Sequence, residues 1–213
     1  MNSLKKRNVL RGIVLTGLLL YAYIAGQLSR TTENIFLANI FSLSRHLVHL
    51  GIVTVWFVSL KQRILSETVR RYLLSIAALI IFWLYIRTIK WMFFSDDVLV
   101  RYLWYAYYIP LILIPLLGVF IVECIGKPQD YRLLPKRKLL YFPALTLLAL
   151  IFTNDLHQLA FGFPEGIQRY SEHYTYHIVY FLVLIWCVCL GLYFVVMLLV
   201  KSRAPGKRWE PPI

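Results

Sequence analysis

Residues 176–200 read YHIVYFLVLIWCVCLGLYFVVMLLV and contain no Asp, Glu, Lys or Arg. A helix needs about 20 predominantly apolar residues to cross the hydrocarbon core of a bilayer, so this stretch is long enough to span one. The whole chain agrees, because 60% of its 213 residues are hydrophobic, against roughly 45–50% in soluble globular domains. We therefore expect an integral membrane protein, with the lipid bilayer as its first partner.

Five further windows on the N-terminal side of that stretch are also long and apolar. They cover residues 9–27, 40–60, 72–89, 99–122 and 139–159. Lipid offers no hydrogen bonds to backbone N–H and C=O groups, so a chain that crosses it satisfies them within helices. The connections are too short for a soluble domain. The sequence therefore predicts an all-α fold, a bundle of about six transmembrane helices in a single domain over residues 1–213.

The basic residues predict the orientation of this bundle. The chain carries 23 Lys and Arg against 10 Asp and Glu, a net charge of +13. Four clusters, at residues 5–11, 61–71, 127–138 and 201–208, hold 17 of the 23. They fall on alternate connections, and cytoplasmic loops of membrane proteins collect Lys and Arg. We expect a multi-pass protein of the cell membrane with both termini in the cytoplasm, in which the basic charge signals topology and does not bind nucleic acid.

The first window has an alternative interpretation. A basic start, KKR, followed by the apolar run VLRGIVLTGLLLYAYIAG, is also the pattern of a cleaved signal peptide. The absence of a following A-x-A cleavage pattern and the length of the run favour a retained span. The remaining topology is the same in either case.

The fourth predicted span combines aromatic residues with prolines. Arg101, Tyr105 and Tyr108 fall on one helical face in RYLWYAYY, so they either line a common wall or belong to an aromatic belt at the membrane interface. Pro110 and Pro115 follow in the same span, and Pro143 lies near the start of the fifth predicted span. Each proline removes a backbone hydrogen bond and predicts a kink, which either shapes the bundle or acts as a hinge.

Polar side chains of the spans gather toward one predicted side of the membrane. At the predicted outer ends lie Arg45, His46, His49, Arg87, Lys90, Arg101, Asn154, Asp155, His157, His173 and His177. The predicted inner half has no counterpart. Charged groups at membrane depth usually face the bundle interior or a cavity, so this distribution favours an outward-facing pocket. The alternative is that each side chain is structural and extends to the lipid headgroups.

The stretch LIFTNDLHQLAFGFPEG, residues 150–166, places the motif N-D-x-H directly against an apolar run. Asp155 is the only acid inside the predicted outer ends of the spans, so we expect it to pair with one of the arginines. We expect Asn154 and His157 to form hydrogen bonds across helices. The candidate ligand-binding residues are Arg45, His49, Arg87, Arg101, Tyr105, Asn154, Asp155 and His157.

Motifs of catalysis and cofactor binding are absent from the sequence. It contains no HExxH, GxSxG, Walker or GxGxxG pattern, so we expect neither enzymatic activity nor a cofactor. The three cysteines lie in or near predicted spans, where no disulfide is expected. A metal site stays open in principle, although no spacing matches a metal motif. Its possible ligands are His46, His49, Asp155, His157, His173 and His177.

Three stretches resemble the seven-transmembrane N-terminal region of bacterial histidine kinases and related sensors. They are RYLWYAYYIPLILIPLLG, GKPQDYRL and LIFTNDLHQLAFGFPEG. Thr153, Asn154 and His157 match a T-N-x-x-H-like stretch that is typical of the fifth span in that family. The resemblance covers most of the chain from about Arg30 to Lys201.

This resemblance implies a sensory input module of a two-component system, which perceives a small ligand or another stimulus at its outer face and acts on a cytoplasmic histidine kinase. It also implies a homodimer. The final residues, KSRAPGKRWEPPI, carry no kinase motif, and six predicted spans stand where the family name says seven. We therefore expect the input part alone, from a truncated reading frame or a stand-alone relative.

Two other functions remain open. A small transporter needs polar residues that continue from the outer to the inner half, and the spans inward of His49, Arg87 and Asp155 are apolar. A membrane scaffold needs a face of small residues for helix packing, of which Ala22-x-x-x-Gly26 is the only hint.

Overall fold

The computed structural model describes residues 2–63, 66–92, 97–128, 131, 133–164, 166 and 174–202. Its contacts divide the chain into two compact units, Met1–Trp56 and Phe57–Ile213. The described residues are mostly helical. Five stretches are long and apolar enough to cross a membrane, namely Gly12–Thr31, Ile35–Leu60, Glu67–Lys90, Asp97–Cys124 and Ile178–Ser202. These coincide with five of the six predicted spans, whereas the single domain over the whole chain stays a prediction.

The first unit consists of α1 (Asn2–Thr31) and most of α2 (Ile35–Arg63). Asn34 separates the two helices, and its Oδ1 accepts hydrogen bonds from the N–H groups of Phe36 and Leu37 at 3.0 and 3.3 Å. An Asn at this position satisfies N–H groups that have no partner within the helix. The small residues Ala22 and Gly26 are buried on α1.

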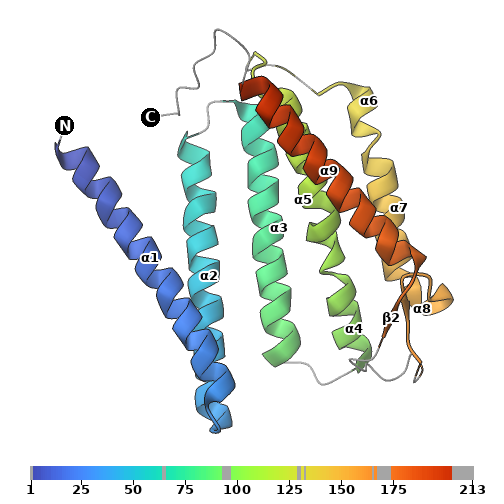
Figure 1. Cartoon of the computed structure of the whole chain (residues 1–213), viewed down its shortest axis with the longest axis horizontal. Coiled ribbons are helices and arrows are strands. Elements are labelled where there is room, and N and C mark those ends of the chain that lie inside the picture. Colours follow the sequence, from blue (N-terminus) through green and yellow to red (C-terminus); the bar gives the residue numbers. More distant parts are fainter. Residues whose placement is uncertain are drawn as a thin grey trace. The chain divides into compact units, whose positions relative to one another are not determined.

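The second unit is organised around one buried helix. It contains α3 (Glu67–Met92), α4 (Asp97–Tyr105), α5 (Tyr108–Cys124), α6 (Pro135–Lys138), α7 (Tyr141–Phe152), α8 (Asn154–His157), β1 (Phe161–Gly162), β2 (Thr175–Tyr176) and α9 (Ile178–Ser202). Helix α5 packs against α3, α7 and α9, and α9 crosses it obliquely (Figure 1). Its side chains Ile112, Leu116 and Phe120 are completely buried. The two short strands are the exception to the predicted all-helical fold.

Prolines explain the interruptions of the helices in this unit. Pro110 has no N–H to donate to the carbonyl of Ala106, and the chain leaves the α-helix between α4 and α5 at this point, as the sequence predicts. Pro115 likewise leaves the carbonyl of Leu111 without its usual partner. That carbonyl accepts a hydrogen bond from the Cys187 thiol of α9 at 3.3 Å. A neighbouring helix thus satisfies the backbone group that proline leaves open.

The predicted span 139–159 contains two short helices, α7 and α8, and the short helix α6 ends one residue before it. Pro143 lacks the N–H that would bond to the carbonyl of Leu139, and this carbonyl instead accepts from the N–H of Phe142 at 2.9 Å. Helix α7 has 12 residues and is about 18 Å long, which is too short to cross a hydrocarbon core of about 30 Å by itself. The apolar helical segment and an irregularity near Pro143 were predicted, whereas the break at Thr153 between α7 and α8 was not.

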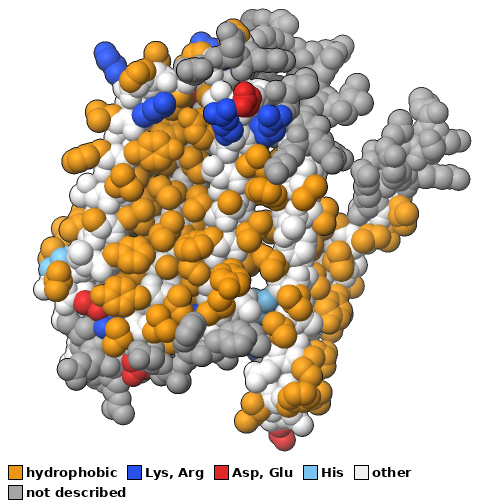
Figure 2. All heavy atoms as spheres, turned by 180° about the vertical axis from the view of Figure 1, so that it is seen from behind, with side chains coloured by type: hydrophobic (Ala, Val, Ile, Leu, Met, Phe, Trp, Pro, Cys, Tyr) orange, Lys and Arg blue, Asp and Glu red, His pale blue; other side chains and the backbone are white. Residues whose placement is uncertain are grey.

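The surface of the helices is mainly apolar. Hydrophobic side chains cover most of the face shown in Figure 2, and charged side chains lie mainly toward its ends. Helix α9 illustrates this, because Leu182, Ile185, Leu192 and Val196 are all exposed. Large exposed apolar surface of this extent is expected of helices that contact lipid.

Candidate functional site

Asp155 of α8 forms an ion pair with Arg101 of α4. The Arg101 Nη2 lies 2.8 Å from Asp155 Oδ2, and Arg101 Nε lies 3.1 Å from both carboxylate oxygens. The Tyr105 hydroxyl donates to Asp155 Oδ1 at 2.7 Å. Arg101 is only 3% exposed and Tyr105 is fully buried. The predicted pairing of Asp155 with an arginine is confirmed, and the partner is Arg101.

Asn154 supports the same site from inside the fold. Its side chain is fully buried, and its Nδ2 donates to the Tyr105 hydroxyl at 3.1 Å and to the carbonyl of Phe161 at 3.0 Å. Its Oδ1 accepts from the N–H groups of Ala160 and Phe161 at 2.9 and 3.0 Å. Asn154 therefore fixes the returning chain against α4. We call Arg101, Tyr105, Asn154 and Asp155 the Asp155 network.

A small hairpin closes this end of the unit. Phe161 and Gly162 of β1 pair antiparallel with Tyr176 and Thr175 of β2. The Phe161 ring is fully buried among the rings of Trp104, Tyr108, Tyr174 and Tyr180, with centroid separations of 4.5–5.9 Å. Arg101, Tyr105 and Tyr108 are all buried on this side, as expected if they line a common wall.

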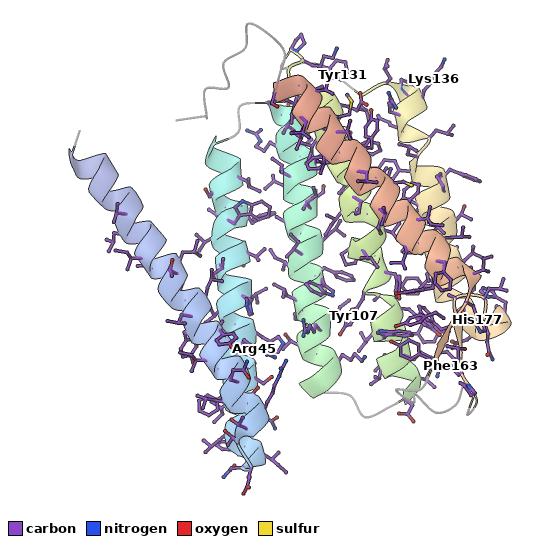
Figure 3. All side chains as sticks on the ribbon, viewed as in Figure 1. Arg45, Tyr107, Tyr131, Lys136, Phe163 and His177 are labelled. Atoms are coloured by element: carbon purple, nitrogen blue, oxygen red, sulfur yellow. The ribbon has the colours of Figure 1, made fainter. Side chains whose placement is uncertain are left out.

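The histidines of this region hold loops in place. His157 Nδ1 accepts from the N–H of Leu159 at 2.9 Å, and its Nε2 lies 3.2 Å from the Thr153 hydroxyl. Among the described residues these contacts stay within its own segment, so the predicted bonding of His157 across helices is wrong. His177 Nδ1 bonds to the carbonyl of Gln158 at 2.6 Å, and Figure 3 shows His177 close to the hairpin. Gln158 has a φ of 50°, which turns the chain sharply after α8.

Gly162 permits the close approach of the hairpin to His177. A Cβ at this position would lie 2.7 Å from both the Thr175 Oγ1 and the His177 Cε1. We predict that Gly162→Ala lowers the free energy of unfolding by about 1–3 kcal/mol, because overpacking forces these groups apart. Gly191→Ala is the matched control, since nothing lies within 4 Å of its added Cβ. Denaturant unfolding in detergent micelles measures both, and equal effects would contradict the role of the contact.

A second group of charges lies at the other end of α5. Lys201 Nζ donates to the carbonyls of Val122, Glu123 and Ile125 at 2.5, 3.3 and 2.8 Å. These carbonyls close α5, where a cation is favoured. The Glu123 carboxylate accepts from the Tyr193 hydroxyl and pairs with Arg137 Nη2 at 3.3 Å. We call Glu123, Arg137, Tyr193 and Lys201 the Glu123 cluster. It lies at the end of α5, whereas the Asp155 network includes residues of α4. Figure 3 shows Lys136, the neighbour of Arg137 in the sequence, far from the hairpin.

The Glu123 cluster corrects the expectation that the other half has no polar counterpart. Glu123 comes one residue after the predicted fourth span and Lys201 one residue after the predicted sixth span. The signal was therefore present, because the two opposite charges end spans on the same predicted side.

A groove of about 440 Å³ lies beside the interruption between α4 and α5. Its lining is almost entirely aromatic and aliphatic: Ile80, Trp83, Trp104, Tyr107, Tyr108, Pro110, Leu111, Ile114 and Pro115. Lys90, which is 3% exposed, places its Nζ 5.7 Å from the centroid of the Tyr107 ring. This α4–α5 groove is large enough for a small apolar molecule, and the sequence analysis did not identify it.

The other candidate residues lie elsewhere. Arg87 is exposed on α3, with its guanidinium 5.9 Å from the centroid of the Trp83 ring, so it is not the partner of Asp155. Arg45 and His49 belong to the first unit. His173 lies outside the described residues. Among the residues that the structure describes, no group of three His, Cys, Asp or Glu is placed to hold a metal ion.

No protein-family model, no curated protein and no solved structure matches the chain.

Proposed function

We propose that the chain is a membrane-embedded sensory input module. In this proposal it crosses the cell membrane several times with both termini in the cytoplasm and perceives a stimulus at the α4–α5 groove and the Asp155 network. It passes the resulting change to a cytoplasmic output of the histidine-kinase type and catalyses no reaction itself. The observation that carries the proposal is the α4–α5 segment, which has the Asp155 network and the groove toward one end and the Glu123 cluster at the other.

The packing between the two ends supports transmission by a shift of α5. The side chains Ile112, Leu116, Val119 and Phe120 are buried at 0–2% exposure against α3, α7 and α9. Packed interfaces move between discrete arrangements and do not deform continuously. These apolar contacts also argue against transport, because a transported polar solute needs polar groups along its path.

The groove gives the stimulus a physical means of action. A ligand shifts a conformational equilibrium only when its affinity differs between the two states. The groove adjoins the interruption at Ala106 and Tyr107, where Pro110 has no N–H to donate to the carbonyl of Ala106. Straightening or bending at this point changes the shape of the groove, so a molecule that fills it favours one arrangement of α5.

We predict that Asp155→Asn changes backbone amide exchange at both ends of α5. The substitution weakens the ion pair with Arg101 and leaves the shape of the side chain nearly unchanged. Hydrogen–deuterium exchange of the full chain in nanodiscs is the measurement, followed by mass spectrometry. We expect exchange around residues 121–128 to increase roughly fivefold or more, the lower end of typical coupling between distant sites.

The matched control is His157→Ala, in the same short helix. The described contacts of His157 reach only Thr153 and Leu159, so its effect is expected to stay within residues 150–164. If Asp155→Asn also changes exchange only in that region, the two ends of α5 are not coupled and the sensory proposal fails.

A further inference from the structure

The segment around α6 combines exposed basic and exposed apolar side chains. Residues 131–142, YRLLPKRKLLYF, contain four Lys and Arg and no Asp or Glu, and the preceding Asp130 lies outside the described residues. Every residue from Leu134 to Leu139 is exposed. Leu139 and Phe142 are each 72% exposed, although both are large and apolar. Basic and apolar side chains exposed side by side are typical of segments at the boundary between lipid headgroups and acyl chains.

The backbone on either side anchors this segment to the second unit. On its N-terminal side, Leu133 is buried in the hydrophobic core, and the carbonyl of Tyr131 accepts a hydrogen bond from the Thr68 hydroxyl of α3 at 3.1 Å. On its C-terminal side, Ala144 of α7 is completely buried. The exposed side chains between these two points therefore extend from an anchored backbone.

Arg137 determines which way the two lysines of α6 point. Its Nη2 lies 3.3 Å from Glu123 Oε1, so its side chain turns toward the end of α5. Successive residues of a helix differ in direction by about 100°, and Lys136 and Lys138 therefore lie on either side of Arg137. Both lysines are exposed, and in the part of the chain that the structure describes neither forms an ion pair with a carboxylate. Figure 3 shows Lys136 at the same end of the unit as Tyr131.

Charge and apolar exposure together indicate one class of partner. Anionic phospholipids offer phosphate groups to the lysines and acyl chains to the neighbouring apolar side chains. Helix α7 continues the apolar surface, because Phe142 and Leu145 are three residues apart on one helical face and both are exposed. In Figure 2, Lys and Arg side chains gather beside hydrophobic ones toward one end of the face shown. An acidic protein would pair with the lysines, but it gives no reason for apolar exposure to continue along α7.

We propose that α6 is a binding site for anionic phospholipid, in which its two lysines pair with headgroup phosphates and the side chains of Leu139 and Phe142 contact the acyl chains. The site discriminates by headgroup charge, because basic segments at a membrane surface are attracted to anionic lipids. Since Arg137 joins the same helix to Glu123, bound lipid also holds α6 against the end of α5. The site requires that the chain lies in a bilayer, but it does not depend on the proposed sensory function.

The test is native mass spectrometry of the purified full chain in a nonionic detergent, titrated separately with dioleoyl phosphatidylglycerol and dioleoyl phosphatidylcholine. We expect the unmodified chain to bind phosphatidylglycerol more tightly. The double variant Lys136→Gln with Lys138→Gln is expected to bind phosphatidylglycerol about tenfold or more weakly, since each basic residue at an anionic surface contributes about fivefold. Its affinity for phosphatidylcholine is expected to stay nearly unchanged, because the apolar contacts remain. Both lysines are exposed, so their replacement leaves folding unaffected.

The matched control is Arg30→Gln with Arg87→Gln, which removes the same net charge from two exposed positions outside this segment. Hydrogen–deuterium exchange in nanodiscs locates the site, and phosphatidylglycerol is expected to slow exchange at residues 136–142 in the unmodified chain but not in the lysine variant. The lipid proposal is overturned if both lipids bind equally or if the control loses as much affinity as the lysine variant. It is also overturned if inorganic phosphate slows exchange as much as phosphatidylglycerol does, which would indicate a site for soluble anions. Unchanged exchange with phosphatidylglycerol would overturn it too and leave the lysines for an acidic protein.

Discussion

Replacing Asn154 with Ala is expected to lower the free energy of unfolding by at least about 3 kcal/mol. Asn154 is fully buried, and its amide bonds to the backbone of Ala160, to both backbone groups of Phe161 and to the Tyr105 hydroxyl. Truncation leaves these buried polar groups without that partner, and each costs about 1–3 kcal/mol when no other partner replaces it. Some repacking reduces the sum, which is why we expect the lower figure.

The measurement is unfolding in mixed detergent micelles with increasing sodium dodecyl sulfate, followed by circular dichroism. Asn39→Ala is the matched control, because Asn39 is exposed on α2 and exposed substitutions usually change stability by less than about 0.5 kcal/mol. A loss below about 1 kcal/mol for Asn154→Ala would show that water or lipid headgroups replace its hydrogen bonds and that it does not hold the returning chain.

The second large effect concerns the ion pair of Arg101 with Asp155. Asp155→Leu is expected to lower the free energy of unfolding by about 3–5 kcal/mol, because it leaves a buried guanidinium without its carboxylate. The double replacement Arg101→Met with Asp155→Leu is expected to recover most of this loss. Apolar side chains of similar volume often replace a buried ion pair at little cost. The double variant is therefore expected to lose less stability than the sum of the losses of the two single variants.

The same unfolding assay measures the single and double variants as a thermodynamic cycle. Glu67→Gln supplies the comparison with an exposed pair, since the side chains of Arg71 and Glu67 are 74% and 60% exposed. Such pairs contribute about 0.2–1 kcal/mol. If the double variant is as unstable as the sum of its single variants, Arg101 already has solvent or headgroup access and the pair is not buried in the membrane protein.

The sequence predicted the helical segments because hydrophobic length alone defines them. Five predicted spans match helical stretches with ends that differ by a few residues. The interruption near Pro110 followed from a missing N–H group. The irregularity near Pro143 followed from the same reasoning. The break at Thr153 was missed, because hydropathy averages over a break that leaves the chain nearly helical.

Part of the site was also predictable. The pairing of Asp155 with an arginine followed from its being the only predicted acid among many basic residues at that side. The choice of Arg101 over Arg87 did not follow, because it depends on which face α3 and α4 present to α8. The predicted hydrogen bond of Asn154 across helices is confirmed by its bond to Tyr105 of α4. Its bonds to Ala160 and Phe161 required knowledge that the chain reverses at Gln158 and returns as a hairpin, which no local pattern in the sequence encodes.

Lys201 joins the end of α9 to the end of α5. Its ammonium group donates hydrogen bonds to the final carbonyls of α5, and it lies one residue before Ser202, where α9 ends. Under the proposed function, a displacement of this last turn of α9 would therefore move the end of α5 with it. The last turn of α9 is connected to the end of α5 by three hydrogen bonds from a single ammonium group.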